Sequence, residues 1–409
     1  MPVINLKRDI IETILVRGGI LTLNFAIIWL VTFFWKAEGN GIRALFMLNI
    51  GIIAIFCNIF TSSSVSYFLR KVGQSRLATQ AYLWIFLTSG IFTILLSLRA
   101  SATDFPLFLF IVSVLLGFLA FHSSLFIGCQ KIPYYNLITL LQPVLLLLFM
   151  LLIYYVFDDK FGFYAYFYAQ ILALLFISVV AKVIAHKTLG KSKLVLDKSV
   201  IKASFNYGWK TELSNLLQFL NYRISMYVLL LLSGVESVGV FAIGVSLAEA
   251  IWIFSRSISL VQYSNVLQTG DTVKSRKETG KVSLISFLAT AACIAIVAVL
   301  PANIFSQIFN GEEFSYVKNI IILLSPGILA IAISNVYGNF FSAIGKLNIL
   351  ILKSAAGVVV TLILSLFLIS EWGIAGACIV NSSAYIVSSV ILFVAFFYKK
   401  PLITSHKSL

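Results

Sequence analysis

Hydrophobic runs of roughly 20 residues recur along the whole chain and are separated by short polar connectors. Each run is long enough to cross a hydrocarbon core of about 30 Å as an α-helix. By hydropathy we count about twelve runs, with approximate bounds of 13–35, 44–68, 79–98, 106–128, 134–157, 162–185, 206–233, 236–266, 282–300, 317–344, 349–370 and 373–397. Period-two alternation is absent, and unpaired backbone groups are costly in lipid, so we expect helices rather than barrel strands. The predicted fold class is all-α.

Composition supports a polytopic integral membrane protein. The chain has 60% hydrophobic and only 11% charged residues, whereas soluble domains are about 25% charged. The first run is too long for a signal-peptide core, so we expect it to remain as a helix. All four cysteines fall inside predicted spans, which argues against a disulfide framework or a metal site. We therefore expect no metal and no cofactor.

Lysine and arginine residues are concentrated in alternate connectors, as the positive-inside rule requires. The two richest connectors contain Lys187, Lys191, Lys193, Lys198 and Lys202, and Lys274, Arg276, Lys277 and Lys281. This alternation supports an even number of spans and places both termini in the cytoplasm. The net charge of +15 is then a topology signal, and its partner is an anionic lipid leaflet rather than nucleic acid.

The longest polar connector, AHKTLGKSKLVLDKSVIKAS, divides the spans into six and six. We therefore predict an N-terminal six-helix lobe (1–187), a cytoplasmic linker (188–205) and a C-terminal six-helix lobe (206–409).

Weak internal repeats link corresponding helices of the two lobes. DKFGFYAYFYAQ (159–170) aligns with SEWGIAGACIVN (370–381), and FHSSLFIGCQK (121–131) aligns with GNFFSAIGKLN (338–348). These alignments pair Gly162 with Gly373, Gln170 with Asn381, and Gly128 with Gly345. Because six is an even number, the repeat is parallel, with a pseudo-twofold axis along the membrane normal. Two such bundles form the architecture of an alternating-access transporter.

The stretch NYGWKTELSNLLQFLNYRIS (206–225) is unusually polar for a membrane span. At about 100° per residue, one narrow stripe contains Lys210, Ser214, Gln218, Asn221 and Ser225. Such a stripe is unfavourable against lipid, so we expect it to face a cavity or the bundle interior. The alternative is interhelical hydrogen bonding within one bundle, with snorkelling for Lys210 and, if the outer end of its helix is close, for Arg223.

Ionisable residues inside the spans have a cationic excess. The cations are Arg17, Lys210, Arg223 and Arg256, and the acids are Glu212 and Glu249. Guanidinium groups bind phosphate in bidentate fashion, so this excess favours an anionic ligand. The alternative is structural ion pairing of Glu249 with Arg256 and of Glu212 with Arg223. These spacings exceed an intrahelical i to i+4 contact, so each pair requires a bend or a neighbouring helix.

Several patterns resemble the Wzx-type polysaccharide repeat-unit flippases of the multidrug/oligosaccharidyl-lipid/polysaccharide (MOP) exporter superfamily. They are Tyr207-Gly208, Arg223, Val238-Gly239-Val240-Phe241-Ala242, Leu247-Ala248-Glu249, Gly128 with Gln130-Lys131, and Gly373 with Gly376-Ala377. The resemblance covers nearly the whole chain, but its motifs are loose. Many relatives have an acid two positions after the residue that matches Arg223, where this chain has Ser225.

The resemblance implies a V-shaped cavity between two lobes in the bacterial cytoplasmic (inner) membrane. It also implies export of an undecaprenyl-pyrophosphate-linked oligosaccharide, such as an O-antigen unit of lipopolysaccharide, to the periplasmic leaflet. On this hypothesis Arg17, Lys210, Arg223 and Arg256 offset the pyrophosphate charge, and Asn215, Gln218 and Asn221 bind sugar hydroxyls. Glu249 and Glu212 remain to couple H+ or Na+. A polysaccharide polymerase and chain-length proteins are the expected protein partners.

Two other functions are compatible with the sequence. A multidrug antiporter of the same fold would extrude cations, and the cationic excess argues against it. A non-transporting membrane partner of a polysaccharide synthase would use the buried charges as structural pairs. An enzyme is not expected, because the sequence has no nucleophile–base constellation, no metal-ligand spacing and no Walker loop.

Overall fold

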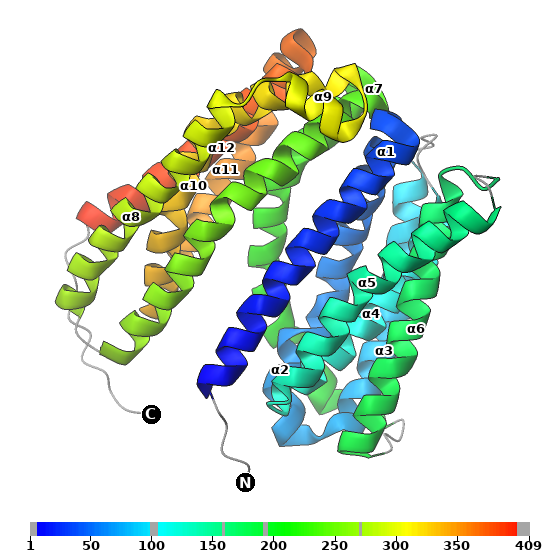
Figure 1. Cartoon of the computed structure of the whole chain (residues 1–409). Coiled ribbons are helices and arrows are strands. Elements are labelled where there is room, and N and C mark those ends of the chain that lie inside the picture. Colours follow the sequence, from blue (N-terminus) through cyan, green and yellow to red (C-terminus); the bar gives the residue numbers. More distant parts are fainter. Residues whose placement is uncertain (1–5, 99–104, 158–159, 191–194, 270–271, 399–409) are drawn as a thin grey trace. The chain divides into compact units, whose positions relative to one another are not determined.

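The computed structural model describes residues 6–98, 105–157, 160–190, 195–269 and 272–398, although some side chains within these ranges, among them that of Lys210, lie outside the description. Every regular element in these ranges is a helix (Figure 1), which confirms the predicted all-α class. The α-helices are α1 (Leu6–Thr61), α2 (Ser63–Val72), α3 (Gln74–Ser97), α4 (Pro106–Gly128), α5 (Ile132–Phe157), α6 (Tyr164–Leu189), α7 (Lys198–Thr269), α8 (Thr272–Val299), α9 (Asn303–Phe309), α10 (Val317–Ala343), α11 (Leu347–Leu364) and α12 (Ser370–Tyr398).

Three long helical stretches, 15–69, 215–252 and 348–398, each contain two membrane crossings. Helix α7 has 72 residues and would extend about 108 Å if it were straight, far more than a bilayer core. Non-helical backbone breaks occur at Lys36 in α1, at Gly234 in α7 and at Gly373 in α12, and the chain reverses direction there (Figure 1). The described residues contain nine candidate spans, and three of them include these breaks. This agrees with the prediction of about twelve crossings.

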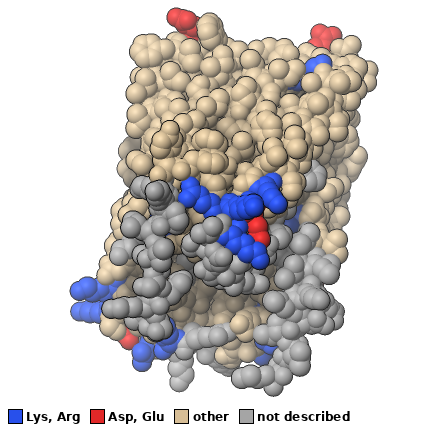
Figure 2. Space-filling model, turned by 90° about the vertical axis from the view of Figure 1, so that its left-hand side faces the viewer, with Lys and Arg blue, Asp and Glu red and all other residues tan. Residues whose placement is uncertain are grey.

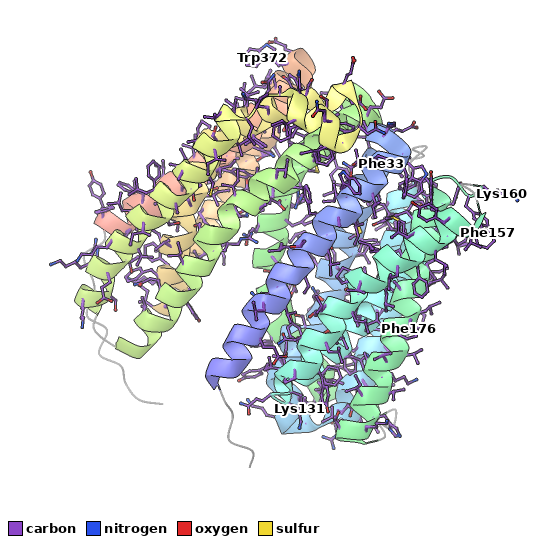
Figure 3. The ribbon with its side chains drawn as sticks, viewed as in Figure 1. Phe33, Lys131, Phe157, Lys160, Phe176 and Trp372 are labelled. Carbon is purple, nitrogen blue, oxygen red and sulfur yellow. The ribbon has the colours of Figure 1, made fainter. Side chains whose placement is uncertain are left out.

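The outer surface of the helices is apolar. Phe176 on α6 is exposed, and its side chain points outward (Figure 3). Figure 2 shows a face with a broad uncharged area, and its charged groups lie along the borders of this area, most of the basic ones along one border. Exposed hydrophobic side chains without charges are what a hydrocarbon environment requires. The chain is therefore a multi-pass membrane protein.

The chain forms two compact units, residues 1–216 and 217–409, which we call unit 1 and unit 2. The division lies inside α7, whereas the sequence placed the start of the second lobe at residue 206. The main core of unit 1 combines residues of α1, α4, α5 and α6. In unit 2, helix α10 packs against α8 and α12, and α11 packs against α12.

The first part of α7 packs closely against the backbone of α1 in unit 1. A Cβ atom at Gly208 would lie 2.0 Å from the Ile59 carbonyl oxygen. One turn earlier, the Ser204 hydroxyl accepts a 2.9 Å hydrogen bond from Gln80, and the Ser64 hydroxyl donates to the Ser204 carbonyl at 3.2 Å. Only glycine permits this approach, so the Tyr207-Gly208 motif has a packing role.

Asp197 caps the N-terminus of α7. One oxygen of its carboxylate, Oδ1, accepts hydrogen bonds from the Ser199 amide at 3.0 Å and the Ser199 hydroxyl at 2.6 Å. The other oxygen lies 3.2 Å from Arg76 of α3. Just before the cap, the Val195 amide donates to Thr79 at 2.8 Å. The connector therefore holds the start of α7 against α3.

We expect this cap to weaken at acidic pH. The hydrogen bond from Ser199, with those from the backbone amides and the charge of Arg76, lowers the pKa of Asp197 below its ordinary value of 3.8. The capping contribution is therefore complete above pH 3.8 and is lost as the pH falls through the lower folded-state pKa. Amide hydrogen exchange of residues 198–202 at neutral and acidic pH measures this loss. Asp197→Asn, which still caps but does not titrate, should show no such loss, and equal pH dependence in both proteins would contradict the assignment.

The internal repeat is visible in the backbone of each unit. Gly162 and Gly373, paired by the sequence alignment, both have positive φ angles, of 50° and 51°. The second alignment needs a correction. Helix α4 ends with the Lys131 amide bonded to Phe126 at 2.8 Å, and α10 ends with the Lys346 amide bonded to Phe341 at 2.9 Å. The left-handed residues of these turns are Gln130 and Gly345, so Gly345 corresponds to Gln130 rather than to Gly128.

Candidate functional site

An ion pair in unit 2 joins the two halves of α7. Arg223 precedes the Gly234 break and Glu249 follows it, so the reversal of the chain brings them together. Arg223 Nη2 lies 2.7 Å from Glu249 Oε1, and the two side chains are 26% and 31% exposed. Sequence reasoning had considered a pair between Glu249 and Arg256, but the structure pairs Glu249 with Arg223. The charge of the carboxylate is thus offset by one guanidinium group.

Two further cations belong to the same unit, and one of them, Arg256, has Tyr222 as a neighbour in common with this pair. Arg256 is exposed, and its guanidinium carbon is 5.8 Å from the centre of the Trp252 ring. Lys353 of α11 is half-buried and lies within Coulombic range of Arg256. We call Arg223, Glu249, Arg256 and Lys353 the cationic cluster. With three cations and one carboxylate, it has a positive net charge.

Sequence reasoning missed Lys353 as a site residue. The predicted span 349–370 already contains this lysine, and the structure places it inside α11. Its position within the apolar run LNILILKSAAGVVV is the signal that could have identified it, because a charge inside a span is a functional candidate.

Three aromatic rings pack beside the cationic cluster. Tyr222, Trp252 and Tyr385 have ring centres between 5.3 and 5.9 Å apart. Tyr222 lies within Coulombic range of Arg223, Glu249 and Arg256, and its hydroxyl accepts a 3.3 Å hydrogen bond from Gln218. The predicted sugar ligand Gln218 thus lies next to the cationic cluster and orients Tyr222.

Asn221 has an interhelical role in the structure. Its side-chain amide is buried, donates to Ser388 of α12 at 3.5 Å and accepts from Thr361 of α11 at 3.4 Å. Gly357 makes room for it, since a Cβ there would lie 2.6 Å from the amide. This is the interhelical hydrogen bonding that the sequence left open as an alternative.

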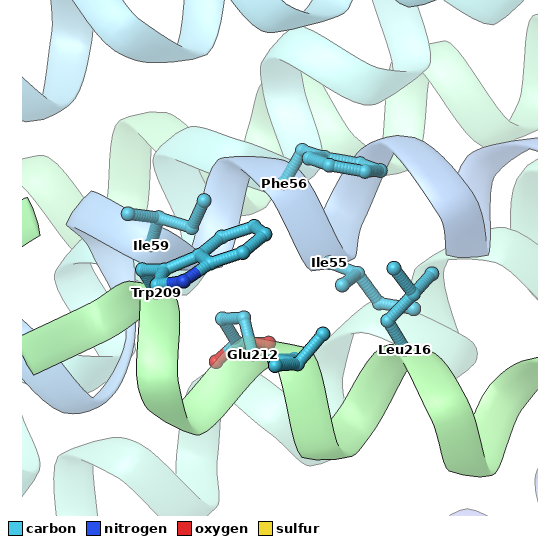
Figure 4. Close-up of a pocket in the computed structure, with 7 residues that line it drawn as sticks. Ile55, Phe56, Ile59, Trp209, Glu212 and Leu216 are labelled. Atoms are coloured by element: carbon cyan, nitrogen blue, oxygen red, sulfur yellow. The ribbon is translucent and has the colours of Figure 1, made fainter. Parts of the chain in front are cut away.

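Glu212 and Asn215 belong to unit 1. Glu212 is only 3% exposed and accepts a 3.0 Å hydrogen bond from Asn215. It lines a small pocket whose other lining residues are Ile55, Phe56, Ile59, Trp209, Leu213 and Leu216 (Figure 4). A carboxylate among apolar side chains favours a proton or a cation as its partner. The hydrogen-bond partner of Glu212 in the described part of unit 1 is thus the Asn215 amide.

The remaining predicted site residues, Arg17 and Lys210, are in unit 1. Arg17 lies on α1 with an exposed side chain. The side chain of Lys210 lies outside the described residues. Among the residues that the structure describes, no group of three or more His, Cys, Asp or Glu residues is placed to hold a metal ion.

Solved structures identify the fold. No protein-family model and no curated protein matches the sequence. An inward-facing multidrug resistance MATE transporter of the MOP superfamily matches with a TM-score of 0.71 and 14% identity, over 92% of this chain and 93% of that one. Lipid II flippase MurJ matches with 0.73 and 14%, over 95% and 87%. A MOP transporter from Pyrococcus furiosus matches with 0.64 and 15%, over 95% of each chain. The chain has the fold of MOP-superfamily transporters.

Proposed function

We propose that this chain is a flippase for a polyprenyl-pyrophosphate-linked oligosaccharide, moving it from the cytoplasmic to the periplasmic leaflet of the bacterial inner membrane by alternating access. The observation that carries the proposal is the net positive charge of the cationic cluster. A pyrophosphate diester has a negative charge on each phosphoryl group. Glu249 does not offset the charges of Arg256 and Lys353. These two positive charges can therefore balance the two negative charges of the diester.

The parts of the cluster would then have distinct roles. Arg256 offers a planar fork for two phosphoryl oxygens, and Lys353 adds a point charge from another helix. Tyr222, oriented by Gln218, supplies a hydroxyl and a ring face at the same place. Glu249 and Glu212 are the acids available to couple transport to a H+ or Na+ gradient. A polysaccharide polymerase and its chain-length partner would use the exported unit.

A multidrug cation antiporter is the second candidate, because Glu212 lies in an apolar pocket beside Trp209. A carboxylate and an aromatic ring together suit an organic cation. Solved structures of this fold include both a multidrug transporter and a lipid flippase. The Pyrococcus furiosus structure is described as having a binding pocket of reverse polarity that suggests a different function. The sign of the charge at the site therefore distinguishes a flippase for an anionic lipid from a cation antiporter.

Ligand binding tests the proposal. The detergent-purified protein is titrated with farnesyl pyrophosphate and with tetraphenylphosphonium, and both affinities are measured by microscale thermophoresis. We expect the pyrophosphate to bind, and the Arg256→Gln/Lys353→Gln variant to bind it at least about tenfold more weakly, because charge-assisted hydrogen bonds are lost. Lys318→Gln, at the N-terminal end of α10, is the control and should bind normally. Preferential binding of the organic cation, unchanged in the double variant, would replace this proposal with the antiporter.

A further inference from the structure

Helix α8 has an inner face that hydrogen bonds fix against its neighbours. Thr279 accepts a 3.0 Å hydrogen bond from Gln262, and Ser286 donates to the Ala332 carbonyl at 3.0 Å. The Ser283 and Tyr337 hydroxyls share a hydrogen bond of 3.2 Å. At about 100° per residue, one stripe of α8 contains the buried residues Ser275, Thr279, Ser283, Ser286 and Thr290. These contacts set the rotation of α8 about its axis.

The opposite face of α8 carries three exposed lysines. Lys274, Lys277 and Lys281 are spaced at i, i+3 and i+7, which places them on one stripe, about half a turn from the inner face. The stripe continues with the exposed apolar residues Leu284, Ile285 and Leu288. The outer face of α8 thus changes from cationic to apolar within about one helical turn.

Two other charged residues of α8, Arg276 and Glu278, lie in the described part of this segment. The Arg276 guanidinium turns toward α12, where it donates to the carbonyls of Phe396 and Phe397. Glu278, between Lys274 and Lys281 along the helix, is half-buried. The corresponding third helix of unit 1, α3, has only Arg76 in its first two turns, and Asp197 pairs with it. The start of α3 therefore lacks a lysine stripe like that of α8.

We propose that the outer face of α8 binds an anionic phospholipid, with the headgroup phosphate on Lys274, Lys277 and Lys281 and the acyl chains along Leu284, Ile285 and Leu288. Lysine stems extend along apolar surface while the ammonium groups stay at the polar interface. Clusters of basic residues at the end of a membrane helix attract anionic headgroups. The apolar continuation places the three lysines at the border of the hydrocarbon, where the anionic groups within their reach are phospholipid headgroups. This inference does not rest on the proposed transport function.

Native mass spectrometry tests the proposal directly. The purified protein is mixed with equal amounts of phosphatidylglycerol and phosphatidylcholine, and the bound lipid is counted after release from detergent. We expect a preference of roughly tenfold for phosphatidylglycerol, reduced at least about fivefold in Lys274→Gln/Lys277→Gln/Lys281→Gln. The matched control is Lys160→Gln/Lys318→Gln/Lys346→Gln, which removes the same charge elsewhere and should keep the preference. Equal preference in both triple variants would overturn the proposal.

A second measurement does not depend on removing the lysines. Leu284→Trp places a fluorophore one turn from Lys281, and brominated lipids quench it according to their local concentration. We expect brominated phosphatidylglycerol to quench the added fluorescence more strongly than brominated phosphatidylcholine at equal mole fraction. Equal quenching by the two lipids would mean that this face has no headgroup selectivity or is covered by protein, and would refute the site.

Discussion

Replacing Gly208 with alanine is expected to destabilise the protein by about 2–4 kcal/mol, despite the better helix propensity of alanine. A Cβ at this position would meet the Ile59 carbonyl oxygen at 2.0 Å and the Ser64 hydroxyl at 2.7 Å. The oxygen belongs to the backbone of α1, so it cannot move aside as a side chain would. Segment 198–216 of α7 would have to separate from α1, which also weakens the hydrogen bonds of Ser204. The free energy of unfolding in detergent measures this loss.

A matched glycine separates this packing effect from a change in helix propensity. Gly280 lies inside α8, and a Cβ added there would have no neighbouring atom within 4 Å. Gly280→Ala should therefore leave stability unchanged or raise it by up to about 1 kcal/mol. Similar shifts in the two variants would show that the close approach of Gly208 to Ile59 does not contribute to stability.

Replacing Glu249 with alanine is expected to move stability and anion binding in opposite directions. Arg223 loses its 2.7 Å partner while it remains mostly buried, which should cost about 1–3 kcal/mol. The cationic cluster would then have no carboxylate, so its affinity for a pyrophosphate should increase. Thermal unfolding and titration with farnesyl pyrophosphate measure the two effects in the same preparation.

The exchanged pair Arg223→Glu/Glu249→Arg is the control for this prediction. It keeps the charge of the cluster and allows the same contact in reverse, so most of the stability should return. If Glu249→Ala lowers anion affinity, the carboxylate holds the site together and is not simply an opposing charge. That result would contradict the roles assigned here.

The helical fold followed from the sequence because its determinants are local. Apolar runs of membrane length and the connectors between them predicted the crossings, including the reversal that the structure places at Gly234. The assignment of residues 198–216 to unit 1 had no such signal. It depends on the approach of Gly208 to Ile59, and a contact between α7 and α1 leaves no periodic pattern in either segment.

The candidate site was only partly predictable for a related reason. The residue types were recognised, since Arg223, Arg256 and Glu249 are charges inside spans. Their partners were not, because the sequence argument considered spacings within one helix, whereas Arg223 meets Glu249 across the turn at Gly234. Lys353 lies inside the predicted span 349–370 but was not selected as a site residue, and only the packing of α11 places it within Coulombic range of Arg256.

Translocation in liposomes tests the central claim, that an anionic lipid-linked glycan is the substrate, most directly. The wild-type protein, Arg256→Gln/Lys353→Gln and Lys318→Gln are reconstituted at equal density with a fluorescent polyprenyl-pyrophosphate oligosaccharide, and its transfer between leaflets is followed by a membrane-impermeant quencher. We predict transfer by the wild type and Lys318→Gln, and loss of transfer in the double variant. No transfer by the wild type under imposed H+ or Na+ gradients, together with efflux of tetraphenylphosphonium, would contradict the account.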